Sequence, residues 1–240
     1  MDDELIETDL RSASQALEEL RERRTELRRE CEGRVVEWRW AREGSDLQRP
    51  EPLYHKRYGL PAPRLLEDAP AAPLNEQQYG YDGEGHIVVA REYESTGSFS
   101  EELRVARGDT VVGYRWSAAG TPVEVNIARF RDGKIRSYVT VWADGRTDPF
   151  HGWLTEHYEY EGDLVVEIHD ESDVAFGDVP VQRPSLTRAS YDPLGRLLEL
   201  REHGDRGEKV LYRARDGAVE GQAAAPRRGS PRRDAANARA

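Results

Sequence analysis

The chain has 240 residues, of which 35 are Lys or Arg and 46 are Asp or Glu, so its formal net charge is −11. Hydrophobic residues make up 37% of it, and no stretch approaches the roughly 18 consecutive apolar residues that a membrane-spanning helix needs. Acidic residues follow Met1, where a signal peptide would carry basic and then apolar residues. The one cysteine, Cys31, rules out an intramolecular disulfide and a cysteine-rich zinc fold. We therefore expect a cytoplasmic protein without a membrane span.

Residues 3–32 carry a stripe of mostly apolar side chains at alternating spacings of four and three, which predicts a helix with one apolar face. Gly33 follows at the position of a left-handed C-terminal cap. The stripe favours packing against a sheet. The alternative is a homodimer through the N-terminal helix as a short coiled coil, although Ala13 and Arg24 weaken such a seam. The stripe consists of Ile6, Leu10, Ala13, Leu17, Leu20, Arg24, Leu27 and Cys31.

The next segment changes from a strand to a loop. Alternating apolar residues predict a strand at Val35–Trp40. Six prolines follow within residues 43–78, and each removes a backbone donor and restricts the residue before it. We expect this Pro-rich strap to contain no long regular element and to be anchored by scattered apolar side chains.

Residues 79–219 follow a period of two, interrupted by Asp-Gly and related turn sequences that join antiparallel neighbours. Val125 and Ile127 alternate with Glu124 and Asn126, which predicts one dry face and one amphipathic face. The predicted fold class is therefore mainly β: a strongly curved antiparallel β-meander of about nine to eleven strands. We expect the N-terminal α-helix and the Pro-rich strap to pack together on one face of it.

The chain divides into three parts. Residues 1–33 form the amphipathic helix, residues 34–220 the β-meander domain, and residues 221–240 a tail of mainly Ala, Arg, Pro and Gly. The tail has a net charge of +4 and no apolar periodicity, which predicts a disordered basic tail.

Two segments of the meander repeat one pattern. Tyr81–Ile87 reads Tyr-Asp-Gly-Glu-Gly-His-Ile, and Tyr191–Leu197 reads Tyr-Asp-Pro-Leu-Gly-Arg-Leu. An Asp that accepts hydrogen bonds from turn amides, followed by a Gly at positive φ, is typical of a hairpin, and turn chemistry alone can produce it. The pattern also resembles the YD repeat of RHS-type proteins, which runs Tyr-Asp, two free residues, Gly-Arg-Leu. The resemblance implies YD-repeat-like hairpins and a bacterial toxin system, in which the chain would be an immunity-type or adaptor protein.

Between Thr147 and Gln182 the chain has ten carboxylates and no Lys or Arg. Such a stretch either is a solvated face or projects a negative field that attracts basic partners and repels nucleic-acid phosphates. Aromatic residues, which are typical interface anchors, interleave with it. We therefore expect a non-enzymatic protein-binding module that binds a basic protein and no nucleic acid. The predicted binding residues, on one face, are Tyr138, Trp142, Trp153, Tyr158, Glu159, Tyr160, Glu167, His169 and Asp170.

Histidines within the same stretch give an alternative. On strands, His157 shares a face with Glu159, and Glu167 shares one with His169, so a turn at Glu161–Asp163 can bring all four together. These ligand types suit a divalent metal, which makes a metal-dependent or acid–base hydrolase the alternative function. The sequence contains no Gly-x-Ser-x-Gly and no His-Glu-x-x-His, and it implies no cofactor.

Overall fold

A computed structural model of the chain describes residues 3–42, 49–143, 150–176, 179–205 and 207–214. The predicted tail at 221–240 lies outside these residues. The helices are α1 (Asp3–Arg34) and α2 (Tyr54–Tyr58). The strands are β1 (Glu37–Arg42), β2 (Arg64–Leu65), β3 (Gln77–Tyr81), β4 (Ile87–Tyr93), β5 (Phe99–Arg107), β6 (Thr110–Trp116), β7 (Pro122–Arg131), β8 (Lys134–Trp142), β9 (Phe150–Glu161), β10 (Leu164–Phe176), β11 (Val179–Tyr191), β12 (Leu197–Gly204) and β13 (Gly207–Arg213).

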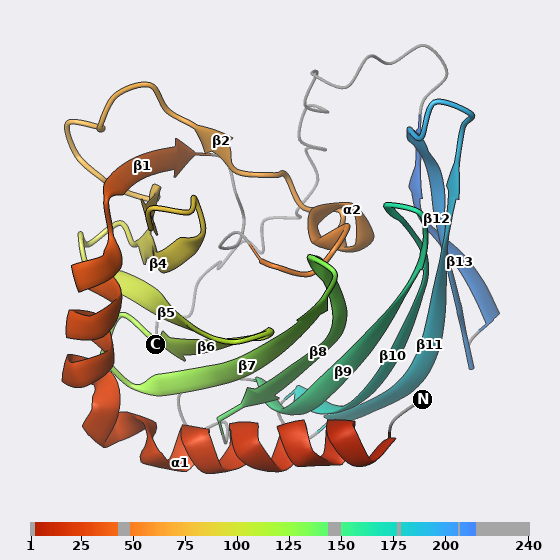
Figure 1. The fold of residues 1–240 in the computed structure, drawn as a ribbon, viewed down its shortest axis with the longest axis horizontal. Helices are drawn as coiled ribbons and strands as arrows, with labels where there is room; N and C mark the ends of the chain where they lie inside the picture. The colour runs from red at the N-terminus through yellow and green to blue at the C-terminus, as the bar shows by residue number, and fades with distance from the viewer. Residues whose placement is uncertain (1–2, 43–48, 144–149, 177–178, 206, 215–240) are drawn as a thin grey trace, which may run out of the picture.

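All the strands belong to one curved antiparallel sheet (Figure 1). From β3 to β13 each strand pairs with the next one along the chain, which makes an uninterrupted meander. β1 continues the sheet between β3 and β2. The predicted mainly β meander is therefore confirmed. Of the described helices, none is long and apolar enough to cross a membrane.

The N-terminal helix covers one face of this sheet. Ala13, Leu20, Leu27 and Cys31 of the predicted stripe are all 0% exposed and pack with apolar side chains of β4 to β8. The stripe is thus used inside the chain and is not available as a coiled-coil seam. The predicted cap at Gly33 is wrong, because α1 continues to Arg34 and the chain then passes directly into the sheet, where the Val36 N–H donates to the Tyr81 carbonyl at 2.8 Å.

Residues 49–66 of the predicted Pro-rich strap at 43–78 cover the other face, and from here on the strap means these residues. It contains only the five-residue helix α2 and the two-residue strand β2, as its prolines predict. Its side chains meet the face that carries Glu124 and Glu156, whereas α1 packs on the opposite face with Val125 and Val139. Figure 1 shows α1 along the outside of the curved sheet and α2 on its inner side. The prediction that helix and strap share a face is therefore wrong.

The two repeated segments form the same turn. Asp82 Oδ1 accepts hydrogen bonds from the backbone N–H groups of Glu84 and His86, at 3.0 and 2.9 Å. Asp192 Oδ1 accepts from those of Leu194 and Arg196, both at 2.9 Å. The following glycines, Gly85 and Gly195, have φ of 83° and 76°, a conformation that L side chains rarely adopt. The predicted hairpin chemistry is confirmed at both positions.

Candidate functional site

The predicted binding residues do not lie on one face of the sheet. Across β8, β9 and β10, Tyr138 is paired with Glu156, and Glu156 with Asp170. His157 and Glu159 alternate with these residues, so they point to the other side. The single-face prediction is wrong because the stretch interleaves odd and even strand positions. Tyr138, Trp142, Tyr158, Tyr160 and Asp170 lie on the strap side, and Trp153, Glu159, Glu167 and His169 lie on the helix side.

Two of the predicted anchors are not available to a partner. Tyr138 is 0% exposed and Tyr158 is 3% exposed, because the strap covers them. Arg49 Nη1 donates to the Tyr138 hydroxyl at 3.4 Å, and the Tyr158 hydroxyl donates to Glu156. Burial first, and then nearby carboxylates, raises the pKa of both tyrosines well above the usual value. The prediction that these two tyrosines are surface anchors is wrong, because both are interior residues.

On the helix side, the sheet beyond α1 carries an acidic surface. α1 packs mainly on β4, β5, β7 and β8, and on this side of β9 and β10 the side chains of Glu159, Glu171 and Asp173 are exposed. Arg188, on β11, donates from Nε to Glu167 at 2.9 Å, and this hydrogen bond is the main cause that lowers the pKa of the Glu167 carboxyl. We define the outer acidic patch as Glu159, Glu167, His169, Glu171 and Asp173, all of which are exposed or half-buried.

Three residues of this patch form a group of metal-ligand types. Glu159 is paired with Glu167 across β9 and β10, and His157 with His169, as the alternative prediction requires. His169 Nε2 lies 3.6 Å from Glu159 Oε1 and 3.3 Å from Glu167 Oε2, and one ligand atom from each residue falls within 4.8 Å of the others. Among the described residues His157 does not join this group. Two carboxylates and an imidazole could hold a divalent ion, in competition with Arg188.

Sequence reasoning missed a layer of buried charge between the strap and the sheet. Arg49 makes a two-pronged ion pair with Glu124, with Nη2 at 3.1 Å from Oε2. Arg57 donates to Glu156 at 2.5 Å and to Asp170 at 3.0 Å. The available signal was a carboxylate at an alternating polar position, Glu124 in β7 and Glu156 in β9, but such a position also fits a solvent-exposed face. Only the position of the strap distinguishes the two.

Glu51, a strap residue, is the most perturbed carboxyl of this layer. It is 7% exposed, and its Oε2 has no hydrogen-bond partner among the described residues. Burial raises the pKa of Glu51 to about 8, against the opposing effect of Arg49 and with a further increase from Glu156. This carboxyl therefore holds its proton to a much higher pH than a solvent-exposed glutamate does.

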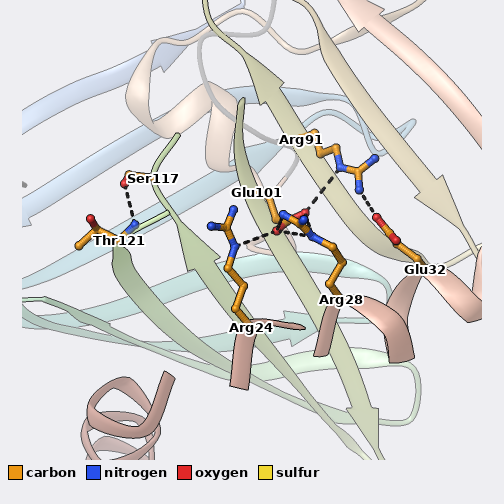
Figure 2. Close-up of polar contacts among 7 residues, drawn as sticks. All are labelled: Arg24, Arg28, Glu32, Arg91, Glu101, Ser117 and Thr121. Carbon is orange, nitrogen blue, oxygen red and sulfur yellow. Dashed lines mark hydrogen bonds and ion pairs between the residues drawn. The ribbon is translucent and has the colours of Figure 1, made fainter. Parts of the chain in front are cut away.

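A second charged cluster joins α1 to the sheet (Figure 2). Glu101 is 0% exposed and lies between Arg24 Nε at 3.4 Å, Arg28 Nη2 at 2.5 Å and Arg91 Nε at 3.6 Å. Glu32 pairs with Arg91 from the helix. Arg24, the charged residue of the predicted apolar stripe, is thus explained by a buried carboxylate on β5. The cluster positions the helix on the sheet.

One cavity lies between the strap and the sheet, and a second lies within the strap. The first has a volume of about 580 Å³ and lies between Pro50, Leu53 and the hairpin turns at one end of β7 to β12. The second has about 570 Å³ and lies within the strap itself, where Arg49, Glu51 and His55 line it beside Leu60 and Pro63. The strap therefore does not fill the space on the inner side of the sheet.

No protein-family model and no curated protein matches the sequence. The resemblance to the YD repeat stays an expectation based on Tyr81–Ile87 and Tyr191–Leu197 alone.

Proposed function

We propose that this chain is a non-enzymatic protein-binding module that recognises a basic partner through the outer acidic patch. The observation that supports the proposal most is the helix side of β9 and β10, where several carboxylates face solvent and, among the described residues, Arg188 is the one arginine paired with them. A negative surface of this kind accelerates association with a positively charged protein and suppresses negatively charged partners.

The kind of partner follows from the same surface. Exposed ion pairs contribute little affinity, so the patch mainly steers association, and the tightly bound part of the interface has to come from half-buried side chains next to it. Trp153 and Leu186 lie on the same side of the sheet and are both half-buried. We assign the anchor role to these two residues in place of Tyr138 and Tyr158.

The resemblance of the two turns to the YD repeat supports a place in a bacterial toxin system, as an immunity-type or adaptor protein. The neighbouring genes test this part of the proposal, because an adjacent gene for a basic toxin domain supports it and a conserved metabolic neighbourhood contradicts it.

Charge reversal on the patch tests the recognition itself. The variant Glu159→Lys, Glu171→Lys, Asp173→Lys should lower the association rate for a basic protein encoded beside the gene by about tenfold or more at low salt, with a flatter salt dependence. The matched control reverses three exposed carboxylates on the outer side of α1, Glu18, Glu22 and Glu26. Equal losses in both variants would mean that net charge, and not this patch, governs binding.

A metal-dependent hydrolase is the second candidate, favoured by the convergence of Glu159, Glu167 and His169. A site for a divalent ion predicts that added Zn²⁺ raises the melting temperature and that a chelator reverses the increase. His169→Ala should remove the effect, and the variant of a distant histidine, His86→Ala, should retain it. A melting curve that does not respond to Zn²⁺, Mn²⁺ or Mg²⁺ eliminates this candidate.

A further inference from the structure

The surface under the strap is built to receive guanidinium groups. Between β7 and β10 the sheet supplies Glu124, Glu156 and Asp170, and the strap supplies Arg49 and Arg57. The side chains of Arg57 and Glu156 are only 4% and 1% exposed, and those of Arg49 and Glu124 only 8% and 2%. The sheet therefore presents two buried acidic receptors, each occupied by one arginine of the same short segment.

Each receptor has its own surrounding hydrogen bonds. Glu124 accepts both prongs of Arg49 and lies 3.8 Å from Arg115, whose Nη1 approaches Oε2 from β6. At the second receptor Arg57 bridges Glu156 and Asp170. There the hydroxyl of Tyr158 donates to Glu156, and that of Ser185 donates to Asp170. These donors hold the carboxylates in position whether or not a guanidinium is present, and a planar fork matches such paired oxygens better than a lysine ammonium does.

Stability alone does not require this chemistry. A buried ion pair often stabilises a fold no more than apolar residues of the same volume, because desolvation offsets the Coulomb attraction. On the helix side of the same sheet apolar contacts dominate, although Glu101 and Asp9 are also buried there against arginines. What the buried carboxylates provide on the strap side is selectivity for arginine.

The strap itself fits this surface imperfectly. A cavity of about 580 Å³ remains between the strap and the sheet, and one of about 570 Å³ remains within the strap. Buried polar atoms lack hydrogen-bond partners among the described residues at Glu51 Oε2, Arg57 Nε and Thr187 Oγ1. Leu53, immediately before α2, has φ of 61°, which is unfavourable for a branched side chain. Strain and unmet hydrogen bonds lower the free energy needed to release the segment.

We infer that the strap is an intramolecular occupant of an arginine-recognition site, and that an arginine-bearing extended segment of the partner binds at Glu124, Glu156 and Asp170 by displacing it. The inference rests on the proposed function for the basic nature of the partner, and it adds a second site on the opposite face of the sheet. Charge complementarity with two receptors, each of which already holds an arginine, identifies the ligand class.

A synthetic peptide of residues 49–60 is the probe, with a control peptide in which both arginines are replaced by lysine. Full-length Arg57→Ala, in which the Glu156 receptor is vacant, should bind the arginine peptide at least tenfold more tightly than the unmodified protein does. The lysine peptide should bind at least tenfold more weakly than the arginine peptide. Adding Glu156→Gln to Arg57→Ala should abolish the tight binding, measured by calorimetry. Equal affinity for the two peptides would overturn the inference.

The outer acidic patch provides the control that separates this inference from the proposed function. Glu159→Lys with Glu171→Lys in the Arg57→Ala protein should leave peptide binding unchanged. Loss of peptide binding in that variant would place the peptide on the patch, and would contradict the site under the strap while leaving the proposed function intact.

Hydrogen exchange on the unmodified protein decides the matter if Arg57→Ala does not fold. An excess of the arginine peptide should speed amide exchange in α2 at least threefold, because the displaced helix is exposed to solvent, whereas the lysine peptide should not. Exchange in α2 that is the same with both peptides at millimolar concentration would refute the displacement.

Discussion

The two faces of the sheet differ in which kind of contact dominates, although each face also contains the other kind. Glu101 is buried among arginines on the helix side, and Leu53 packs on the buried apolar cluster of Ile168 on the strap side. On the helix side, Leu20, Leu27 and the valines of β7 and β8 exclude water by apolar contact, which is nondirectional and tolerates small shifts. On the strap side, Glu124 and Glu156 are buried by pairing with arginines, which requires specific distances. The comparison indicates that α1 stabilises the fold, whereas the strap is positioned by interactions that another guanidinium group can replace.

The largest expected effect tests the apolar side. Leu20→Asp places a charge at a position that is 0% exposed, and should lower the free energy of unfolding by roughly 5 kcal/mol, enough to unfold much of the protein. Denaturation in urea measures it. The control Thr25→Asp, at an exposed position on the same helix, should change stability by less than about 0.5 kcal/mol. A Leu20→Asp protein as stable as the control would show that α1 is not a core element.

Removal of one partner of the buried Arg57–Glu156 ion pair should have the next largest effect on stability. Arg57→Ala or Glu156→Ala should each lower the free energy of unfolding by about 3 kcal/mol, because the remaining charge stays buried without its partner. The double variant should lose clearly less than the sum of the two losses, since neither charge then remains. Additive losses would show that the pair does not interact as its geometry indicates.

Glu51 gives a pH-dependent effect of intermediate size. In the folded protein the pKa of Glu51 is raised from 4.5 to about 8, so above pH 4.5 the carboxyl ionises more readily in the unfolded protein. The free energy of unfolding therefore falls as the pH rises from 4.5 to 8. Glu51→Gln removes this loss, and should raise the free energy of unfolding by about 1–3 kcal/mol at pH 9 but hardly at pH 4. A stabilisation that is the same at both pH values would contradict the assignment of the effect to ionisation.

The smallest expected effect on stability concerns Gly120, which lies against Arg24 where α1 meets the sheet. Gly120 has φ of +81°, and a Cβ there would lie 2.5 Å from Arg24 Nη1. Gly120→Ala should lower the melting temperature by a few degrees, corresponding to about 1 kcal/mol. The control Gly83→Ala has no positive φ and no atom within 4 Å of the new methyl group, so it should have little effect.

The general form of the fold could be predicted from particular residues. The stripe that contains Leu20 and Leu27 predicted the long helix and its buried face, and the Asp and Gly of the two repeated segments predicted their hairpin turns. Both are local patterns, because helix periodicity and turn chemistry depend on residues a few positions apart. The hairpin of β9 and β10 was predictable for the same reason, but the pairing of His157 with His169 also depends on a β-bulge between Val165 and Glu167 that shifts the register by one residue.

The sequence by itself determined the helix, the order of the hairpins and the alternation of apolar and polar positions along each strand. Only the tertiary structure decided which polar positions are buried, since the strap returns across the inner side of the sheet and brings Arg57 to Glu156, 99 residues away. An alternating carboxylate looks the same in sequence whether it faces water or a distant arginine. Long-range packing that no local pattern encodes decides which carboxylates the strap buries. It therefore also decides the difference between the outer acidic patch and the carboxylates Glu124, Glu156 and Asp170 under the strap.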